Sequence, residues 1–73
     1  MFLYELKEGQ RAEISELFAE GEFSSRLRDM GFCEGEEIMC VKKAVFKSPV
    51  LYKVKGSLIA LRKAEAEKIE VVL

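Results

Sequence analysis

A helix stop in the first half of the chain constrains the fold more than any other feature. Phe23, Leu27 and Met30 recur at helical spacing and form one apolar stripe, which predicts a short α-helix at about residues 23–30. Gly31 follows directly, where the last helical turn needs a residue in the left-handed conformation that glycine adopts without a Cβ clash. We therefore expect the helix to end at Gly31.

The residues after this stop turn the chain into a strand. Phe32 is positioned to fold back on Leu27, which is the hydrophobic contact typical of a glycine-terminated helix. Gly35 then supplies a tight turn, and a strand pattern begins near Glu37. No other stretch has the length and periodicity of a long helix. One small helix must therefore flank a sheet built from the rest of the chain.

Alternation of apolar and polar residues predicts several short strands. The strand segments are residues 11–15 with a bulge or strand end near Glu16, residues 37–43, a hairpin over residues 50–62 that turns at Lys55-Gly56 or at Gly56-Ser57, and residues 69–73. Residues 64–68 form about one helical turn, and the apolar run within residues 37–43 favours a strand buried on both sides. We predict a mainly β fold, a small partly open barrel of five or six short strands, in a single domain spanning residues 1–73.

The predicted hairpin has two distinct faces. Its inward face is apolar and consists of Val50, Tyr52, Val54, Ile59 and Leu61. If no neighbouring strand covers the opposite face, that face presents an apolar centre with a basic rim, which is the layout of a modest protein–protein interface. We predict partner binding there, by Leu51, Lys53, Lys55, Leu58 and Arg62.

Charge is segregated along the chain although the net charge is only −1. Seven basic residues and no acidic residue lie between Lys42 and Lys63, whereas ten acidic and four basic residues precede Lys42. A docking face and an ordinary solubilised surface both explain this segregation. The near-neutral total argues against a general nucleic-acid binder. No apolar run reaches the length of a membrane span or a secretory signal, so the two cysteines indicate free thiols in a reducing cytoplasm.

The chain offers little catalytic chemistry. It has no histidine, so the commonest general base and metal ligand is missing, and no serine stands in a nucleophile motif. We therefore expect no enzyme activity and no resident cofactor. The candidate ligands for a weakly bound divalent cation such as Fe²⁺ cluster at the turn after the helix and are Cys33, Glu34, Glu36 and Glu37. A solvated acidic turn without metal is the simpler interpretation of the same residues.

Several motifs, taken in order, resemble the FeoA family of small cytoplasmic accessory proteins of ferrous iron uptake. The matching motifs are residues 6–10 (LKEGQ), residues 26–32 (RLRDMGF) with Gly35, Pro49, residues 54–56 (VKG) and residues 59–66 (IALRKAEA). The resemblance implies an SH3-like barrel and a place beside a membrane iron permease that carries a cytoplasmic GTP-binding domain. It also implies kinship with domains at the C-terminus of iron-dependent repressors.

Three functions follow, in order of preference. The first is a non-enzymatic cytoplasmic module that binds the GTP-binding part of the permease and approaches the membrane only through that partner. The second is a metal-binding or metal-responsive module that uses the acidic turn. The third is a nucleic-acid-binding barrel that stacks bases on Tyr52 or Phe46 beside the basic hairpin. Because Tyr52 is predicted to face inward, we expect no nucleic-acid partner.

Overall fold

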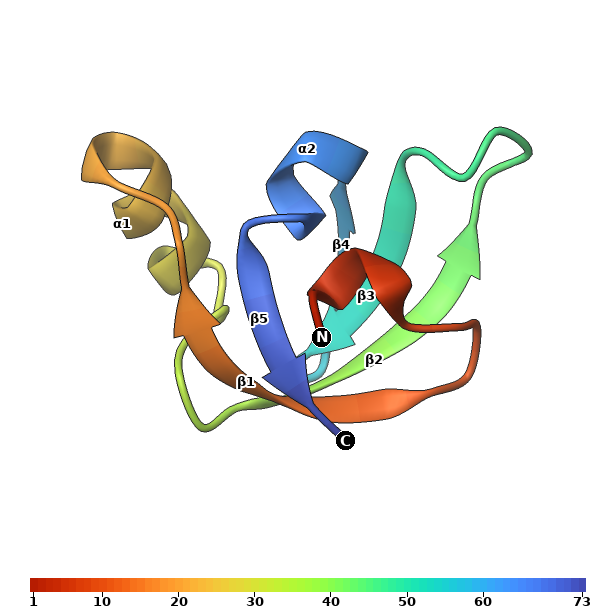
Figure 1. Cartoon of the computed structure of the whole chain (residues 1–73), viewed down its shortest axis with the longest axis horizontal. Helices are drawn as coiled ribbons and strands as arrows, with labels where there is room; N and C mark the ends of the chain where they lie inside the picture. The colour runs from red at the N-terminus through yellow and green to blue at the C-terminus, as the bar shows by residue number, and fades with distance from the viewer.

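Short strands and tight turns build one five-stranded antiparallel sheet in the computed structural model, which describes residues 1–73 (Figure 1). In chain order the elements are η1 (Leu3–Glu5), β1 (Arg11–Leu17), α1 (Gly21–Asp29), β2 (Glu37–Lys43), β3 (Val50–Val54), β4 (Ser57–Leu61), α2 (Lys63–Ala66) and β5 (Ile69–Val72). The strand order β4-β3-β2-β1-β5 makes β4 and β5 the two edges. The predicted mainly β fold is confirmed, with five strands in an open sheet.

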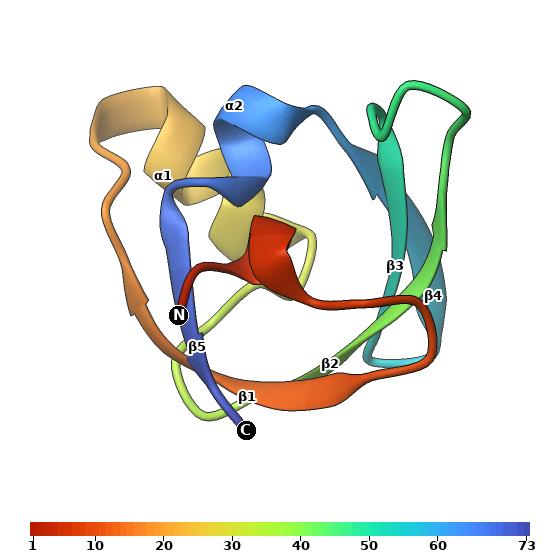
Figure 2. The same ribbon diagram turned by 45° about the vertical axis from the view of Figure 1, so that its right-hand side comes forward.

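The sheet curls around its own core. Figure 2 shows β3 and β4 along one side, β5 along the other, and α2 and η1 between them. The largest fully buried side chains inside this curl are Tyr52 and Phe32. The Tyr52 hydroxyl donates a hydrogen bond to the carbonyl oxygen of Leu3 at 3.3 Å, and burial raises the pKa of this phenol. None of the helices is long and apolar enough to cross a bilayer.

Burial alternates along β2, which corrects the prediction of a strand buried on both sides. Ile38 and Cys40 are fully buried and pair with Val54 and Tyr52 of β3. Met39 lies between them on the other face and is only half-buried. The physical reason is that an antiparallel sheet with nothing packed on its outer face exposes every second residue, whatever its polarity. The apolar run therefore marks an outer surface as well as a core strand.

Other local predictions are confirmed. The pairing of β1 with β5 shifts register between Ile14 and Glu16, which is the predicted bulge. The hairpin turns at Lys55 and Gly56, with φ angles of 50° and 77° that match a tight two-residue turn. Gly35 has a φ of 91°, as a turn glycine should. Sequence patterns did not predict the 3-10 helix η1.

The helix stop has the hydrogen bonding of a Schellman motif. Gly31 has a φ of 104°, and its amide donates to the carbonyl of Arg28 at 3.0 Å. The amide of Phe32 reaches back to the carbonyl of Leu27 at 2.9 Å. Leu27 and Phe32 are both fully buried in the same core cluster, and Leu27 is the buried residue of α1. The stop therefore fastens α1 to the sheet through one side chain on each side of the glycine.

Replacing Gly31 with alanine is expected to lower the free energy of unfolding by about 1 kcal/mol or more, because alanine tolerates a positive φ poorly. The added Cβ would lie 3.4 Å from Cδ of Lys55, which is an ordinary contact, so the loss comes from the backbone. Urea unfolding measures it. Ser25→Ala, at an exposed position in the same helix, serves as the control and should change stability by less than about 0.5 kcal/mol. Equal midpoints for Gly31→Ala and the parent would contradict this role.

Candidate partner-binding site

The outer face of the β3–β4 hairpin carries the core of the predicted partner-binding site. The register places Leu51 opposite Ala60 and Lys53 opposite Leu58, so these four side chains share one face. Leu58 is 61% exposed, so its side chain is available for contact with a partner. Lys53, Leu58 and Ala60 are all exposed, so this face lies open to solvent. The structure therefore brings Leu51, Lys53 and Leu58 together as predicted.

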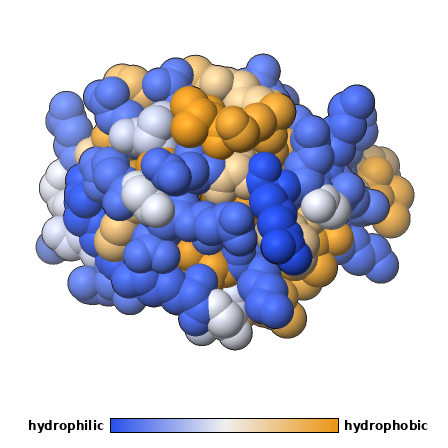
Figure 3. Space-filling model, turned by 90° about the horizontal axis from the view of Figure 1, so that it is seen from below, coloured by the Kyte–Doolittle hydropathy of each residue, from blue (hydrophilic) through white to orange (hydrophobic).

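Met39 of β2 extends this face, and sequence reasoning missed it. It pairs with Lys53 and is half-buried. A shallow depression of about 240 Å³ lies beside it and is lined by Arg11, Glu37, Met39, Lys53, Lys55 and Gly56. In the view from below, hydrophobic residues form separate patches divided by hydrophilic side chains (Figure 3). The surface is thus mixed rather than continuously apolar, and non-obligate interfaces are on the whole about as apolar as the rest of a protein surface.

Lys55 and Arg62 lie at the margins of the site. The ammonium nitrogen of Lys55 is 3.6 Å from a carboxylate oxygen of Glu36, and its stem runs close to Gly31. Arg62 follows the far end of β4 and lines a separate groove of about 470 Å³ beside the end of α1. Strand parity predicts both residues on the outer face with Lys53. Lys55 lines the depression beside Met39 together with Lys53, whereas Arg62 lines the separate groove. Lys53 is the basic residue that pairs directly with Leu58.

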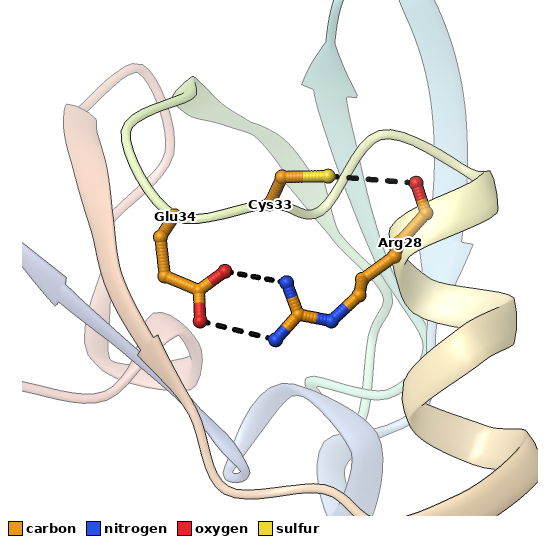
Figure 4. Close-up of polar contacts among 3 residues, drawn as sticks. All are labelled: Arg28, Cys33 and Glu34. Carbon is orange, nitrogen blue, oxygen red and sulfur yellow. Dashed lines mark hydrogen bonds and ion pairs between the residues drawn. The ribbon is translucent and has the colours of Figure 1, made fainter.

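The turn after the helix is organised by an ion pair. Figure 4 shows the guanidinium of Arg28 facing the carboxylate of Glu34, with hydrogen bonds of 2.6 and 3.1 Å. The side-chain hydrogen bond from Arg28 lowers the pKa of Glu34, and the same bond raises the pKa of Arg28. The Cys33 thiol points toward the backbone of the same arginine and donates to the carbonyl oxygen of Arg28 at 3.5 Å. A bidentate arginine holds this carboxylate in place across the helix stop.

The other carboxylates predicted as metal ligands lie beside basic side chains that differ from one carboxylate to the next. Glu36 lies beside Lys55, and Glu37 lies 4.0 Å from the guanidinium of Arg11. The structure contains no group of three or more cysteine or carboxylate side chains that could hold a metal ion. It thus does not bring Cys33, Glu34, Glu36 and Glu37 together, and metal binding by these residues stays a prediction.

The Arg28–Glu34 pair predicts a pH-dependent contribution to stability. The pKa of Glu34 in the folded state lies below its value in the unfolded chain, which is about 4.3 for glutamate. The ionised carboxylate therefore stabilises the fold at pH values above the unfolded pKa. This contribution is lost as the pH falls through the folded pKa. Glu34→Gln should therefore lower the melting temperature slightly at pH 7 and leave it equal to the parent near about pH 2. Raising the salt concentration should shrink the difference at pH 7, because the pair is exposed. An equal difference at both pH values would contradict this assignment.

The fold and its surfaces define a class of protein. An open, curled five-stranded antiparallel sheet of this size, with short helices at one end and an uncovered outer face, is a small SH3-like β-domain. Its outer face is open to solvent at Lys53, Leu58 and Ala60.

The chain belongs to the FeoA family, since the model of the FeoA domain matches residues 1–73. It is 38% identical over 73 residues to a Fe(2+) transport protein A/Fe(2+) transporter FeoB fusion protein of Porphyromonas gingivalis, covering all of this chain and 9% of the fusion protein. It is 34% identical to a putative Fe(2+) transport protein A of Campylobacter jejuni, covering 99% of that protein. The family is associated with ferrous iron transport.

Solved structures show the same fold. The iron(II) transport protein A of Clostridium thermocellum has a TM-score of 0.96 at 41% identity, with 100% of this chain and 45% of that chain covered. The FeoA protein of Stenotrophomonas maltophilia, described as an SH3 domain protein and solved in complex with zinc, has a TM-score of 0.86 at 35% identity over 97% of this chain and 88% of that chain. A manganese-dependent transcriptional repressor shares only the fold, at 14% identity and a TM-score of 0.88, over 99% of this chain and 40% of that chain.

Proposed function

We propose that this protein is a cytoplasmic, non-enzymatic interaction module that acts on the GTP-binding cytoplasmic part of a ferrous iron permease. The observation that carries the proposal is the Porphyromonas gingivalis relative, in which a homologous domain and the transporter FeoB form one polypeptide. Fusion of two domains implies that they work at the same place. A separate chain needs a binding surface to reach the same arrangement.

The outer face of the hairpin supports this proposal. Exposed Leu58 lies diagonally across from half-buried Leu51, and half-buried Met39 lies on the other side of Lys53. These apolar side chains are surface that a partner can cover. Lys53, which lies between Met39 and Leu58, contributes charge that steers encounter with an acidic partner surface. The module acts without catalysis of its own, because the chain has no histidine and the face carries no activated nucleophile.

Binding kinetics against a purified GTP-binding domain of the permease test this proposal. Lys53→Glu should slow association roughly two- to tenfold at low salt and much less at moderate salt, because rim charge acts mainly on encounter. Leu58→Ser should leave association nearly unchanged and speed dissociation about tenfold, because it removes apolar contact from the bound state. Lys53 is changed alone, because Lys55→Glu would set a second carboxylate against Glu36 and disturb the fold.

Matched controls separate this site from the rest of the surface. Lys68→Glu makes the same charge change beside Phe23, well away from the hairpin, and should bind with parental kinetics. The melting temperatures of all variants should stay close to that of the parent, since the altered side chains are exposed. Parental kinetics in both Lys53→Glu and Leu58→Ser would show that this face does not bind the partner.

A second candidate function is a metal-responsive module, which the zinc complex of the Stenotrophomonas maltophilia relative favours. Cys33 and the carboxylates of Glu34, Glu36 and Glu37 are the side chains of this chain that would supply ligands. An anaerobic calorimetric titration with Fe²⁺ tests it. Micromolar one-to-one binding that is lost in Cys33→Ser and Glu34→Gln supports this function, and the absence of heat at millimolar Fe²⁺ contradicts it.

A further inference from the structure

The loop between β2 and β3 holds the two most exposed apolar side chains of the domain. Val45 is 91% exposed and Phe46 is 90% exposed. Figure 1 shows this loop projecting beyond the sheet at the opposite end of the molecule from α1, and Figure 2 shows the same projection. Leaving a phenylalanine and a valine together in water at a loop tip is costly, so their position requires a reason.

The loop is held in shape by hydrogen bonds at its base. The amide of Lys47 donates to the carbonyl of Ala44 at 2.7 Å, which closes a tight turn with the two apolar residues at its centre. The amide of Ala44 donates to the carbonyl of Pro49 at 3.2 Å, and the Tyr4 hydroxyl donates to the carbonyl of Lys47 at 2.9 Å. These hydrogen bonds fix the conformation of the tip. Little conformational entropy is therefore lost when the tip is buried against a binding partner or surface.

Basic side chains surround the base of this tip. The ammonium groups of Lys43 and Lys63 lie 4.9 and 5.4 Å from the centre of the Tyr4 ring, and Lys47 is exposed within the loop itself. One acidic residue, Glu8, lies beside the base of the loop, where its carboxylate accepts a hydrogen bond from the backbone amide of Lys43 at 2.7 Å. The chain carries no acidic residue between Lys42 and Lys63. An apolar tip thus stands within a collar of positive charge.

We propose that this loop docks on an anionic lipid surface, with Val45 and Phe46 entering the boundary between headgroups and acyl chains. The lysine collar then lies against the anionic headgroups, and the Tyr4 ring sits at their level, where aromatic side chains with a polar end are favoured. This goes beyond the proposed function, in which the domain reaches the membrane only through its partner.

The shape and charge of the loop favour lipid over a protein partner. Two side chains on a narrow projection cover far less than the roughly 800 Å² that each partner contributes to a standard protein interface. Of their exposed neighbours, Lys47 and Ser48 are polar, and Pro49 adds only one small ring to the apolar surface. A fluid headgroup layer accepts such a tip without a matching pocket, and its negative charge complements a collar of one sign.

Nuclear magnetic resonance with vesicles tests the proposal on the complete 73-residue chain. The probes are vesicles of phosphatidylcholine alone and vesicles with phosphatidylglycerol, each with a spin-labelled lipid. We expect line broadening that is strongest for residues 44–49 with the anionic vesicles, weaker at high salt, and near zero with phosphatidylcholine alone.

Variants assign the effect to the tip and the collar. Val45→Ser combined with Phe46→Ser should weaken partition into anionic vesicles about tenfold or more, because it removes the apolar tip. Lys47→Glu should weaken partition in proportion to the anionic lipid content. Leu58→Ser and Lys68→Glu are the matched apolar and charge controls, and both should partition as the parent does.

The same variants separate this proposal from partner binding. The double serine variant should bind the GTP-binding domain of the permease with parental kinetics, whereas Leu58→Ser should bind it less well. The proposal is overturned if the parent does not broaden with anionic vesicles at millimolar lipid, or if the double serine variant partitions like the parent. If the parent does not bind vesicles and the double serine variant loses binding to the GTP-binding domain, the tip instead enters a pocket of that domain.

Discussion

The hydrogen bond from the Phe32 amide to the Leu27 carbonyl, across a left-handed Gly31, is the interaction on which the rest of the structure depends. It buries one side chain from each side of the stop in the same core cluster. The chain then turns at Gly35, whose amide donates to the carbonyl of Ile14 at 2.8 Å, so that the turn is fastened to β1. The segment from Gly31 to Gly35 therefore reverses the chain and joins α1, the longer of the two α-helices, to the central strands of the sheet.

The same chain reversal also determines which polar side chains of the surface are used by the fold. It sets Glu34 against Arg28 and brings Glu36 beside Lys55, so the acidic turn is occupied by ion pairs of the fold. On the outer face of the hairpin and in the loop after β2, by contrast, Leu58 and Phe46 are exposed. In a domain with one curled sheet, the core takes one face entirely. Function is therefore left to the outer face, the sheet edges and the loops.

Features fixed by local chemistry could be predicted from the sequence. Gly31 and Gly56 mark backbone positions with positive φ, and alternation assigned the two faces of the hairpin. The 3-10 helix at Leu3–Glu5 could not be predicted, because it depends on packing against β5 and α2 and has no periodic pattern. The burial of β2 was predicted wrongly for a related reason, since an apolar run does not reveal whether anything covers its second face.

The candidate site was predictable only in part. Leu51, Lys53 and Leu58 follow from strand parity, but Met39 joins them through a cross-strand register that the sequence does not display. Lys55 lines the depression with Met39 and Lys53, but its contact with Glu36 joins residues far apart in the chain and is not visible in the alternation pattern. The exposure of Val45 and Phe46 depends on how the loop closes on itself and on Tyr4, which are contacts between residues far apart in the chain.

Amide hydrogen exchange at Phe32 tests the central role of the helix stop most directly. If the bond to Leu27 joins helix and sheet, the Phe32 amide exchanges only through global unfolding, as slowly as the most protected amides of β2 and β3. Gly31→Ala should then speed exchange at all of these amides by the same factor. Fast exchange at Phe32 while the amides of β2 and β3 stay protected would show that the stop opens independently and that the sheet does not depend on it.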